Sequence, residues 1–234
     1  MSADSSQPLQ RLSALGQSIW VDFLSRDSIR GGHLQELIDD FAVVGATSNP
    51  SIFEKAMGSG DAYDEQINEL AADGKDTEET FWALAQQDIE GACDVFRPVW
   101  ESSEHRDGYV SLEVDPRLAY DTLATYREAM RLHDEVDREN LMVKIPATKP
   151  GLAAIEDVIA KGRSINVTLI FSLQRYAEVA ESYVRGLERL VAEGGDPSKV
   201  ASVASFFVSS FRSTASAAIS ASVIQPLFSL PWLA

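Results

Sequence analysis

Short apolar segments alternate with longer amphipathic segments along most of the chain, and this alternation restricts the folds open to it. Within each short segment the apolar residues run almost without interruption, which is typical of parallel strands covered by helices. Six such strands are expected, over residues 18–23, 41–47, 108–115, 141–147, 165–171 and 200–209. The pattern therefore predicts an α/β fold.

Helical patterns fill the intervals between these strands. Asp76 and Glu79 form an Asp-x-x-Glu helix start, and Pro116 is expected to begin the following helix. Neither a glycine-rich dinucleotide fingerprint nor a phosphate-binding loop follows any of the strands. The pattern thus favours a TIM (β/α)8 barrel over a doubly wound nucleotide-binding sheet, with about six of the eight barrel strands present.

Charge and composition limit the partners of the protein. The 36 acidic and 20 basic residues give a formal net charge of −16, which disfavours broad electrostatic binding to nucleic acid or to a membrane. Cys93 is the only cysteine, and the three histidines lack the spacing of metal ligands. The N-terminal residues do not resemble a secretory signal. We expect a cytoplasmic protein without a metal site, and the sequence leaves its oligomeric state open.

Polar residues interrupt five of the six expected strands. An isolated polar side chain buried in this way costs several kcal/mol unless it is paired. The polar residues of the five strands are therefore better explained as neighbours of one another. Asn166 and Thr168 are two residues apart and therefore share one face of their strand. In a barrel, such faces converge near the carboxyl ends of the strands. The interrupting residues are Asp22, Glu113, Lys144, Asn166, Thr168 and Ser205, and Asn49 follows the remaining strand.

Lys144 is the most informative member of this set. Surrounding hydrocarbon disfavours the charged form of an amine, and the neutral amine can attack a ketone to form a Schiff base. Cleavage of the adjacent carbon–carbon bond also needs an acid and a base, which Asp22 and Glu113 could supply. Taken singly, each residue has a structural alternative: Lys144 an ion pair, Glu113 a salt bridge to Arg117, and Asp22 a cap or turn. Asn49 could likewise cap a helix that begins nearby.

At these residues the sequence resembles the transaldolase family, in its longer bacterial branch. The resemblance covers about residues 15–209 and is carried by "VDFLSRD", "GATSNPSIF", "SLEVDPRLAYD", "LMVKIPAT" and "INVTLIFS". It implies a TIM barrel enzyme that acts on sugar phosphates of the pentose phosphate pathway. The implied reaction moves a dihydroxyacetone unit from sedoheptulose 7-phosphate to glyceraldehyde 3-phosphate through a lysine Schiff base, without a cofactor.

The resemblance also implies a role for each catalytic candidate. Lys144 matches the family's Schiff-base lysine. Asp22 matches the acid/base that handles the proton of the substrate hydroxyl next to the cleaved bond. Glu113 and Thr168 match the pair that positions a catalytic water for the carbinolamine and imine steps.

Four further positions match residues that bind the substrate. Asn49 and Asn166 match side chains that hydrogen-bond the dihydroxyacetone portion. Ser205 and Phe207 match residues of the sixth strand that line the same pocket. The resemblance thus distributes the substrate contacts over three strands.

The resemblance ends after about residue 209, and the composition changes there. We therefore expect an N-terminal arm over 1–14, a partial barrel over 15–209, and an atypical tail over 210–234 of a truncated or frame-shifted chain. Position 210 is serine where the family continues with an arginine that binds the substrate phosphate. Two alternatives to an active transaldolase remain open: a catalytically impaired product, and a Schiff-base fructose 6-phosphate aldolase.

Overall fold

The structure is a computed structural model that describes residues 8–207 and 222–226. The chain divides into two compact units, which are described one at a time. The first comprises Met1–Val110 with Val136–Asn140, and the second comprises Ser111–Glu135 with Leu141–Ala234.

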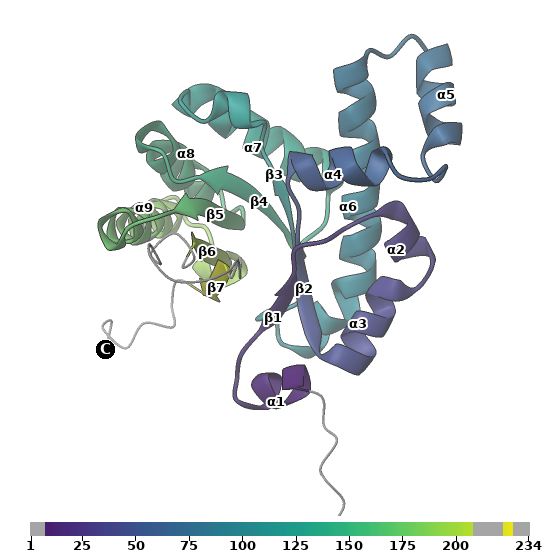
Figure 1. Ribbon diagram of the computed structural model, residues 1–234. Helices are drawn as coiled ribbons and strands as arrows, with labels where there is room; N and C mark the ends of the chain where they lie inside the picture. The colour runs from purple at the N-terminus through teal and green to yellow at the C-terminus, as the bar shows by residue number, and fades with distance from the viewer. Residues whose placement is uncertain (1–7, 208–221, 227–234) are drawn as a thin grey trace, which may run out of the picture. The chain divides into compact units, whose positions relative to one another are not determined.

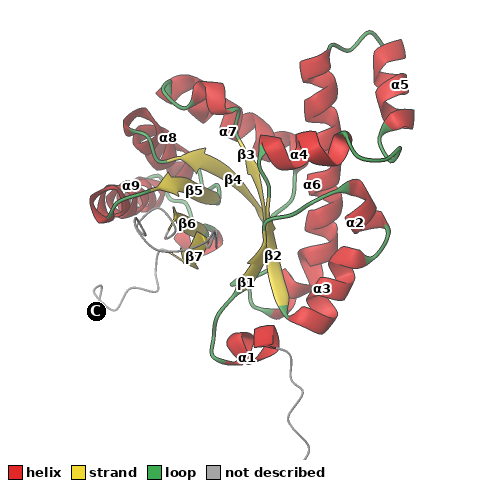
Figure 2. Cartoon of the chain, in the orientation of Figure 1, coloured by secondary structure: helices red, strands yellow, loops and turns green. Residues whose placement is uncertain are grey.

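The first unit contains two parallel strands and six helices among its described residues. Figure 2 shows helices α2 and α3 beside the long helix α6, in agreement with the contacts between these elements. The elements in chain order are α1 (Pro8–Ala14), β1 (Ile19–Val21), α2 (Arg26–Arg30), α3 (His33–Phe41), β2 (Val43–Thr47), α4 (Pro50–Met57), α5 (Asp64–Ala72) and α6 (Thr77–Ser102). The first two residues of β3 (Tyr109–Glu113) also belong to this unit.

Strands β1 and β2 pair in parallel, and Trp20 lies opposite Gly45 in their register. A Cβ atom added to Gly45 would lie 2.5 Å from the Trp20 ring, closer than real atoms approach. Glycine is therefore required here, because the indole occupies the space of any larger side chain.

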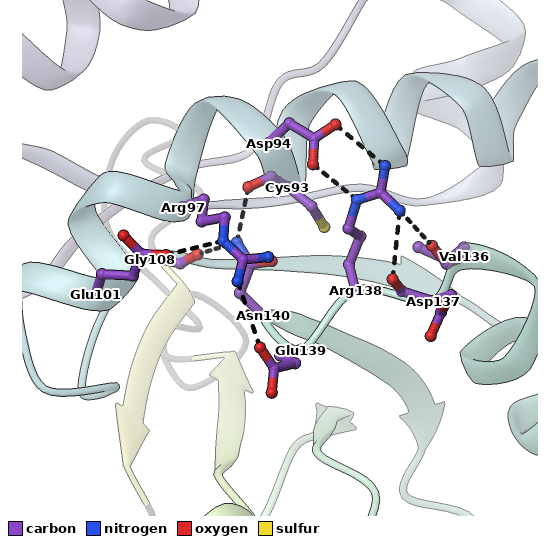
Figure 3. Close-up of polar contacts among 10 residues, drawn as sticks. All are labelled: Cys93, Asp94, Arg97, Glu101, Gly108, Val136, Asp137, Arg138, Glu139 and Asn140. Carbon is purple, nitrogen blue, oxygen red and sulfur yellow. Dashed lines mark hydrogen bonds and ion pairs between the residues drawn. The ribbon is translucent and has the colours of Figure 1, made fainter.

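The segment Val136–Asn140 contacts helix α6 through polar side chains (Figure 3). Arg138 donates to the carboxylate of Asp94, with Nε 2.7 Å from Oδ1 and Nη2 3.2 Å from Oδ2. The buried Asn140 side chain donates to the backbone carbonyls of Cys93 and Gly108, both at 2.9 Å. These bonds fix the chain immediately before β4 begins.

The second unit begins within β3 and continues through alternating strands and helices. Figure 1 shows α8 and α9 side by side along the strands β4 to β6. After β3 the elements are η1 (Pro116–Leu118), α7 (Thr122–Val136), β4 (Leu141–Pro146), α8 (Lys149–Ala160), β5 (Ile165–Ile170), α9 (Leu173–Ala192), η2 (Pro197–Lys199), β6 (Ser202–Phe207) and β7 (Ser222–Pro226).

The sheet of the second unit joins strands that are consecutive in the chain. β4 pairs with β5 and β5 with β6, both in parallel, whereas β7 pairs with β6 in the antiparallel direction. Helices α8 and α9 cross closely, since a Cβ atom added to Gly186 would lie 2.7 Å from Ile159. The core of this unit consists of the apolar faces of these helices and the strands beneath them.

These observations confirm the predicted α/β class. All six expected strands are found in the described part of the chain, as β1 to β6. Neighbouring strands follow the chain order, as in a (β/α) barrel, and no reversal of the order occurs among the strands that the structure describes within each unit. The helix expected after Asp76 begins there, with the capping box between Asp76 and Glu79.

Two expectations about element boundaries are wrong. Strand β1 ends at Val21, so Asp22 follows the strand and is exposed rather than buried within it. Pro116 begins a 3₁₀ turn, and helix α7 begins only at Thr122. The Asp121 side chain accepts a hydrogen bond from the amide of Ala124 at 2.9 Å and provides that later start.

The ends of the chain are described only in part. Pro8–Ala14 of the expected N-terminal arm form helix α1, and Ser222–Pro226 of the expected tail form strand β7. The remaining positions of the arm and tail, Ser210 among them, lie outside the described residues. In the part of the chain that is described, no helix has the length and apolar character needed to span a membrane.

Candidate active site

Lys144 and Glu113 form a buried ion pair in the second unit. Lys144 lies on β4 and Glu113 at the end of β3, with Nζ 3.2 Å from Oε2. The two residues are 7% and 8% exposed. Both extend from strands whose other residues are buried and, apart from Ser111, mainly apolar, so the pair has little contact with water. At this distance the carboxylate is placed to exchange a proton with the amine.

Asn166 connects three strands of the second unit through its side-chain amide. Its Oδ1 accepts a hydrogen bond from Ser205 Oγ of β6 at 2.9 Å, and its Nδ2 donates to Ser111 Oγ of β3 at 3.0 Å. Asn166 is fully buried and lies opposite Lys144 in the register of β4 and β5. The two hydrogen bonds fix the orientation of the amide, because the acceptor and the donor atom each have a partner.

Thr168 and Phe207 lie further along their strands. Thr168 is 1% exposed and stands two residues beyond Asn166, on the same face of β5. Phe207 is the last residue of β6, and its ring centroid lies 5.3 Å from that of Phe171. The second unit thus brings together Lys144, Glu113, Asn166 and Ser205, with Thr168 on the same face as Asn166.

Asp22 and Asn49 belong to the first unit. Asp22 is exposed and follows β1, so its side chain carries no cost of burial in this structure. Asn49 precedes α4, and its Oδ1 accepts a hydrogen bond from the amide of Ile52 at 3.0 Å. The capping alternative is therefore correct for Asn49 Oδ1.

One member of the cluster is missing from the sequence-based prediction. Ser111 is fully buried, and its Oγ accepts a hydrogen bond from Asn166 Nδ2 at 3.0 Å. Its signal was present, because it stands two residues before Glu113 and so shares a face of β3 with it. Glu113 pairs with Lys144, and Arg117 pairs with Asp115.

This arrangement suits chemistry at a carbonyl group. A buried amine can attack a carbonyl carbon, a neighbouring carboxylate can move protons, and oriented hydroxyl and amide groups can hold substrate hydroxyls. Over residues 8–207 and 222–226, no group of three or more His, Cys, Asp or Glu side chains is arranged to hold a metal ion.

Comparison with known proteins assigns the chain to a family. The sequence profile described as "Transaldolase/Fructose-6-phosphate aldolase" matches residues 19–225. The transaldolase of Mycobacterium tuberculosis (strain CDC 1551 / Oshkosh) is 56% identical over 201 residues, which cover 86% of this chain and 54% of that protein.

Two further relatives give the same result. The transaldolase of Mycolicibacterium paratuberculosis is 55% identical over 201 residues, covering 86% of this chain and 54% of the relative. The transaldolase of Mycobacterium marinum is 53% identical over 207 residues, which cover 88% of this chain and 56% of that relative. The chain thus spans about half the length of the curated relatives it matches. On the extent of the profile match and on these identities, the chain belongs to the transaldolase/fructose-6-phosphate aldolase family.

Proposed function

We propose that the protein is a Schiff-base transaldolase of the cytoplasm. It would transfer a dihydroxyacetone unit from sedoheptulose 7-phosphate to glyceraldehyde 3-phosphate. The observation that carries this proposal is the buried Lys144–Glu113 pair, with its amine 3.2 Å from a carboxylate, beside the oriented amide of Asn166. The family match and the names of the relatives support the same reading.

Each step of the reaction has a candidate group. Lys144 Nζ attacks the ketose carbonyl to give a carbinolamine, and water leaves as the iminium forms. Glu113 and Thr168 position the water and move the protons of these steps. Asp22 takes the proton of the hydroxyl beside the cleaved bond, while the bond electrons move to the iminium nitrogen. The resulting three-carbon enamine attacks the acceptor aldehyde.

Four residues are proposed to hold the substrate. The Nδ2 groups of Asn49 and Asn166 hydrogen-bond the dihydroxyacetone portion. Ser205 orients Asn166 through the bond from its Oγ to Oδ1, at 2.9 Å, and lines the pocket together with Phe207. Ser111 is added to this set because it holds the other end of the same amide.

Borohydride trapping tests the assignment of the nucleophile. Incubation with fructose 6-phosphate and borohydride should leave a reduced sugar adduct on Lys144, identified by peptide mass mapping. Lys144→Arg should abolish the adduct, because the guanidinium does not form a Schiff base. Lys161→Arg is the matched control, since Lys161 is an exposed lysine paired with Glu193, and it should leave the adduct unchanged. An adduct on a lysine other than Lys144 would overturn the proposal.

A fructose 6-phosphate aldolase is the second candidate, because the matching family description names both activities. The two differ in what happens to the three-carbon enamine. A transferase needs an acceptor aldose for turnover, whereas an aldolase releases dihydroxyacetone after protonation. We expect turnover of fructose 6-phosphate to depend on added acceptor. Equal turnover without acceptor would instead assign the aldolase activity.

A further inference from the structure

A closed cluster of charged and aromatic side chains is buried in the first unit. Arg26 Nε lies 2.8 Å from Asp88 Oδ1, and the hydroxyl of Tyr63 donates to Asp88 Oδ2 at 2.7 Å. The same hydroxyl accepts a hydrogen bond from the backbone amide of Arg26 at 2.9 Å, and the guanidinium stacks on the Tyr63 ring at 4.4 Å. All three residues are at most 3% exposed. We call them the Arg26–Tyr63–Asp88 cluster.

The cluster joins three elements of the first unit. Arg26 is the first residue of α2, Tyr63 precedes α5, and Asp88 lies in the middle of α6. Burial, with the hydrogen bond to Asp88, raises the pKa of Tyr63, so the hydroxyl keeps its proton and remains a donor. Apolar residues of similar volume often stabilise a core as well as a buried ion pair does. Stability alone thus gives no reason for this arrangement, whereas its directional bonds fix where α2 begins.

The start of α2, which the cluster holds in place, lies close to Asp22 in the chain. Arg26 stands four positions after Asp22, and the three residues between them include the fully buried Leu24 and the helix cap Ser25. On the other side, β1 is held by its parallel pairing with β2 up to Val21. The backbone at Asp22 is therefore anchored at both ends, by the sheet before it and by the cluster after it.

We propose that the Arg26–Tyr63–Asp88 cluster positions Asp22 for the proton transfer that accompanies carbon–carbon cleavage. The inference rests on the proposed function, in which the Asp22 carboxylate accepts the hydroxyl proton as the bond electrons pass to the iminium nitrogen. The products of this step are an aldehyde and a three-carbon enamine on Lys144. The cluster residues touch no reacting atom, so they are positioning residues whose loss slows cleavage but not Schiff-base formation.

The size of the trapped adduct separates these two steps. Borohydride reduction before cleavage leaves a six-carbon adduct on Lys144, whereas reduction after cleavage leaves a three-carbon adduct. In Tyr63→Phe, which removes only the bridging hydroxyl, we expect the ratio of six-carbon to three-carbon adduct to rise on the order of tenfold, because a displacement of about 1 Å can slow a reaction this much or more. The total adduct on Lys144 should stay near that of the unmodified chain.

Tyr183→Phe is the matched control. It removes the hydroxyl of another buried tyrosine, which lies 3.4 Å from the carbonyl oxygen of Val200 in the second unit, and should leave the adduct ratio unchanged. Asp88→Asn keeps a hydrogen-bonding side chain of the same shape and provides a second cluster variant with the same expected result. Asp22→Asn should raise the ratio further, and adding Tyr63→Phe to it should have no additional effect.

The outcomes distinguish the inference from the proposed function. An unmodified chain that forms no adduct on Lys144 overturns both. Normal adduct formation with an unchanged ratio in Tyr63→Phe and Asp88→Asn overturns the inference alone. A fall of both adducts in equal proportion also overturns it, because that result indicates loss of folded protein rather than displacement of Asp22.

Discussion

At the scale of single residues, the Lys144–Glu113 pair links stability to chemistry. Removing one partner of a buried ion pair leaves an uncompensated charge and destabilises a protein by roughly 3–5 kcal/mol, whereas replacing both partners with apolar groups is often neutral. Glu113→Gln should therefore lower the free energy of unfolding by about this amount. Adding Lys144→Met to Glu113→Gln should restore most of the loss, measured by denaturant unfolding. The pair is 3.2 Å apart and nearly buried, which is the basis of this expectation.

An exposed pair is the control for this cycle. Lys161 and Glu193 lie 2.9 Å apart with side chains about half exposed, so Glu193→Gln should have no measurable effect on stability. If Glu113→Gln were as mild as Glu193→Gln, the Lys144 ammonium would not depend on this carboxylate. The proposed exchange of a proton between them would then lose its structural support.

His133 predicts how stability depends on pH. Burial lowers its pKa to about 4 from the ordinary 6.5, and the charge of Arg163 contributes in the same direction. Its Nε2 lies 2.9 Å from the carbonyl oxygen of Ser164. Since the folded-state pKa is the lower one, the stabilisation by neutral His133 is complete above pH 6.5 and is lost as the pH falls from 6.5 to 4. Through His133 alone, the free energy of unfolding should fall by about 2 kcal/mol as the pH is lowered from about 7.5 to about 5.

Two substitutions isolate the contribution of His133. His133→Gln keeps a side-chain donor near Ser164 but cannot titrate, so its denaturant unfolding should lack this part of the pH dependence. His33→Gln removes an exposed histidine and should keep it. Equal pH dependence in the unmodified chain and in His133→Gln would contradict the prediction.

Site residues were predictable wherever an apolar strand made the polar residue unusual. Lys144, Glu113 and Asn166 stand out in the sequence because their neighbours are hydrocarbon, and the structure brings them together. Ser111 was missed because a lone serine in a strand gives a weak signal, although burial makes its hydroxyl depend on a partner. Asp22 was expected inside a strand because sequence patterns do not locate the end of a three-residue strand.

At the scale of elements, strand β5 contains a local backbone strain at Leu169. This residue has φ of 59° and is 43% exposed, and the pairing of β5 with β6 shifts register between Val167 and Ile170. The left-handed conformation costs a residue with a Cβ atom roughly 1–2 kcal/mol but costs glycine little. We expect Leu169→Gly to retain or raise the melting temperature and Leu169→Val to lower it.

Leu173 is the control for this pair of variants. It is also exposed, but it is the first residue of α9 and has ordinary helical geometry. Leu173→Gly should therefore give no gain in melting temperature. Two outcomes would show that strain at Leu169 is not significant. One is a gain in melting temperature from glycine at both positions. The other is no gain at either position, together with an unchanged melting temperature in Leu169→Val.

Helix starts show what local sequence does and does not specify. The capping box of Asp76 and Glu79 was predictable because both hydrogen bonds lie within four residues. The expectation that Pro116 begins the next α-helix is wrong, because proline at a first position fits a 3₁₀ turn as well. The choice depended on Asp121, which caps α7 five residues later.

At the scale of the whole molecule, the sequence identified the order of strands and helices but not the pairing of the chain's last described strand. The parallel order follows from apolar runs separated by helices, which are local patterns. The pairing of β7 with β6 joins Ser205 to Ile224 and Phe207 to Ser222 across more than a dozen residues. Such a pairing depends on which sheet edge is accessible, and a composition change after residue 209 does not reveal that.

Strand β7 covers one edge of β6, and this predicts how the whole chain behaves in solution. An uncovered strand edge offers unpaired amide and carbonyl groups to other molecules. In Val223→Pro/Ile224→Pro, two successive amides of β7 are lost, and one of them must face β6 because strand amides alternate in direction. We expect faster hydrogen exchange at alternate amides of β6 and more self-association in sedimentation. Val223→Ala/Ile224→Ala keeps both amides and should preserve the exchange rates; unchanged exchange in the proline variant would mean that β7 does not protect this edge.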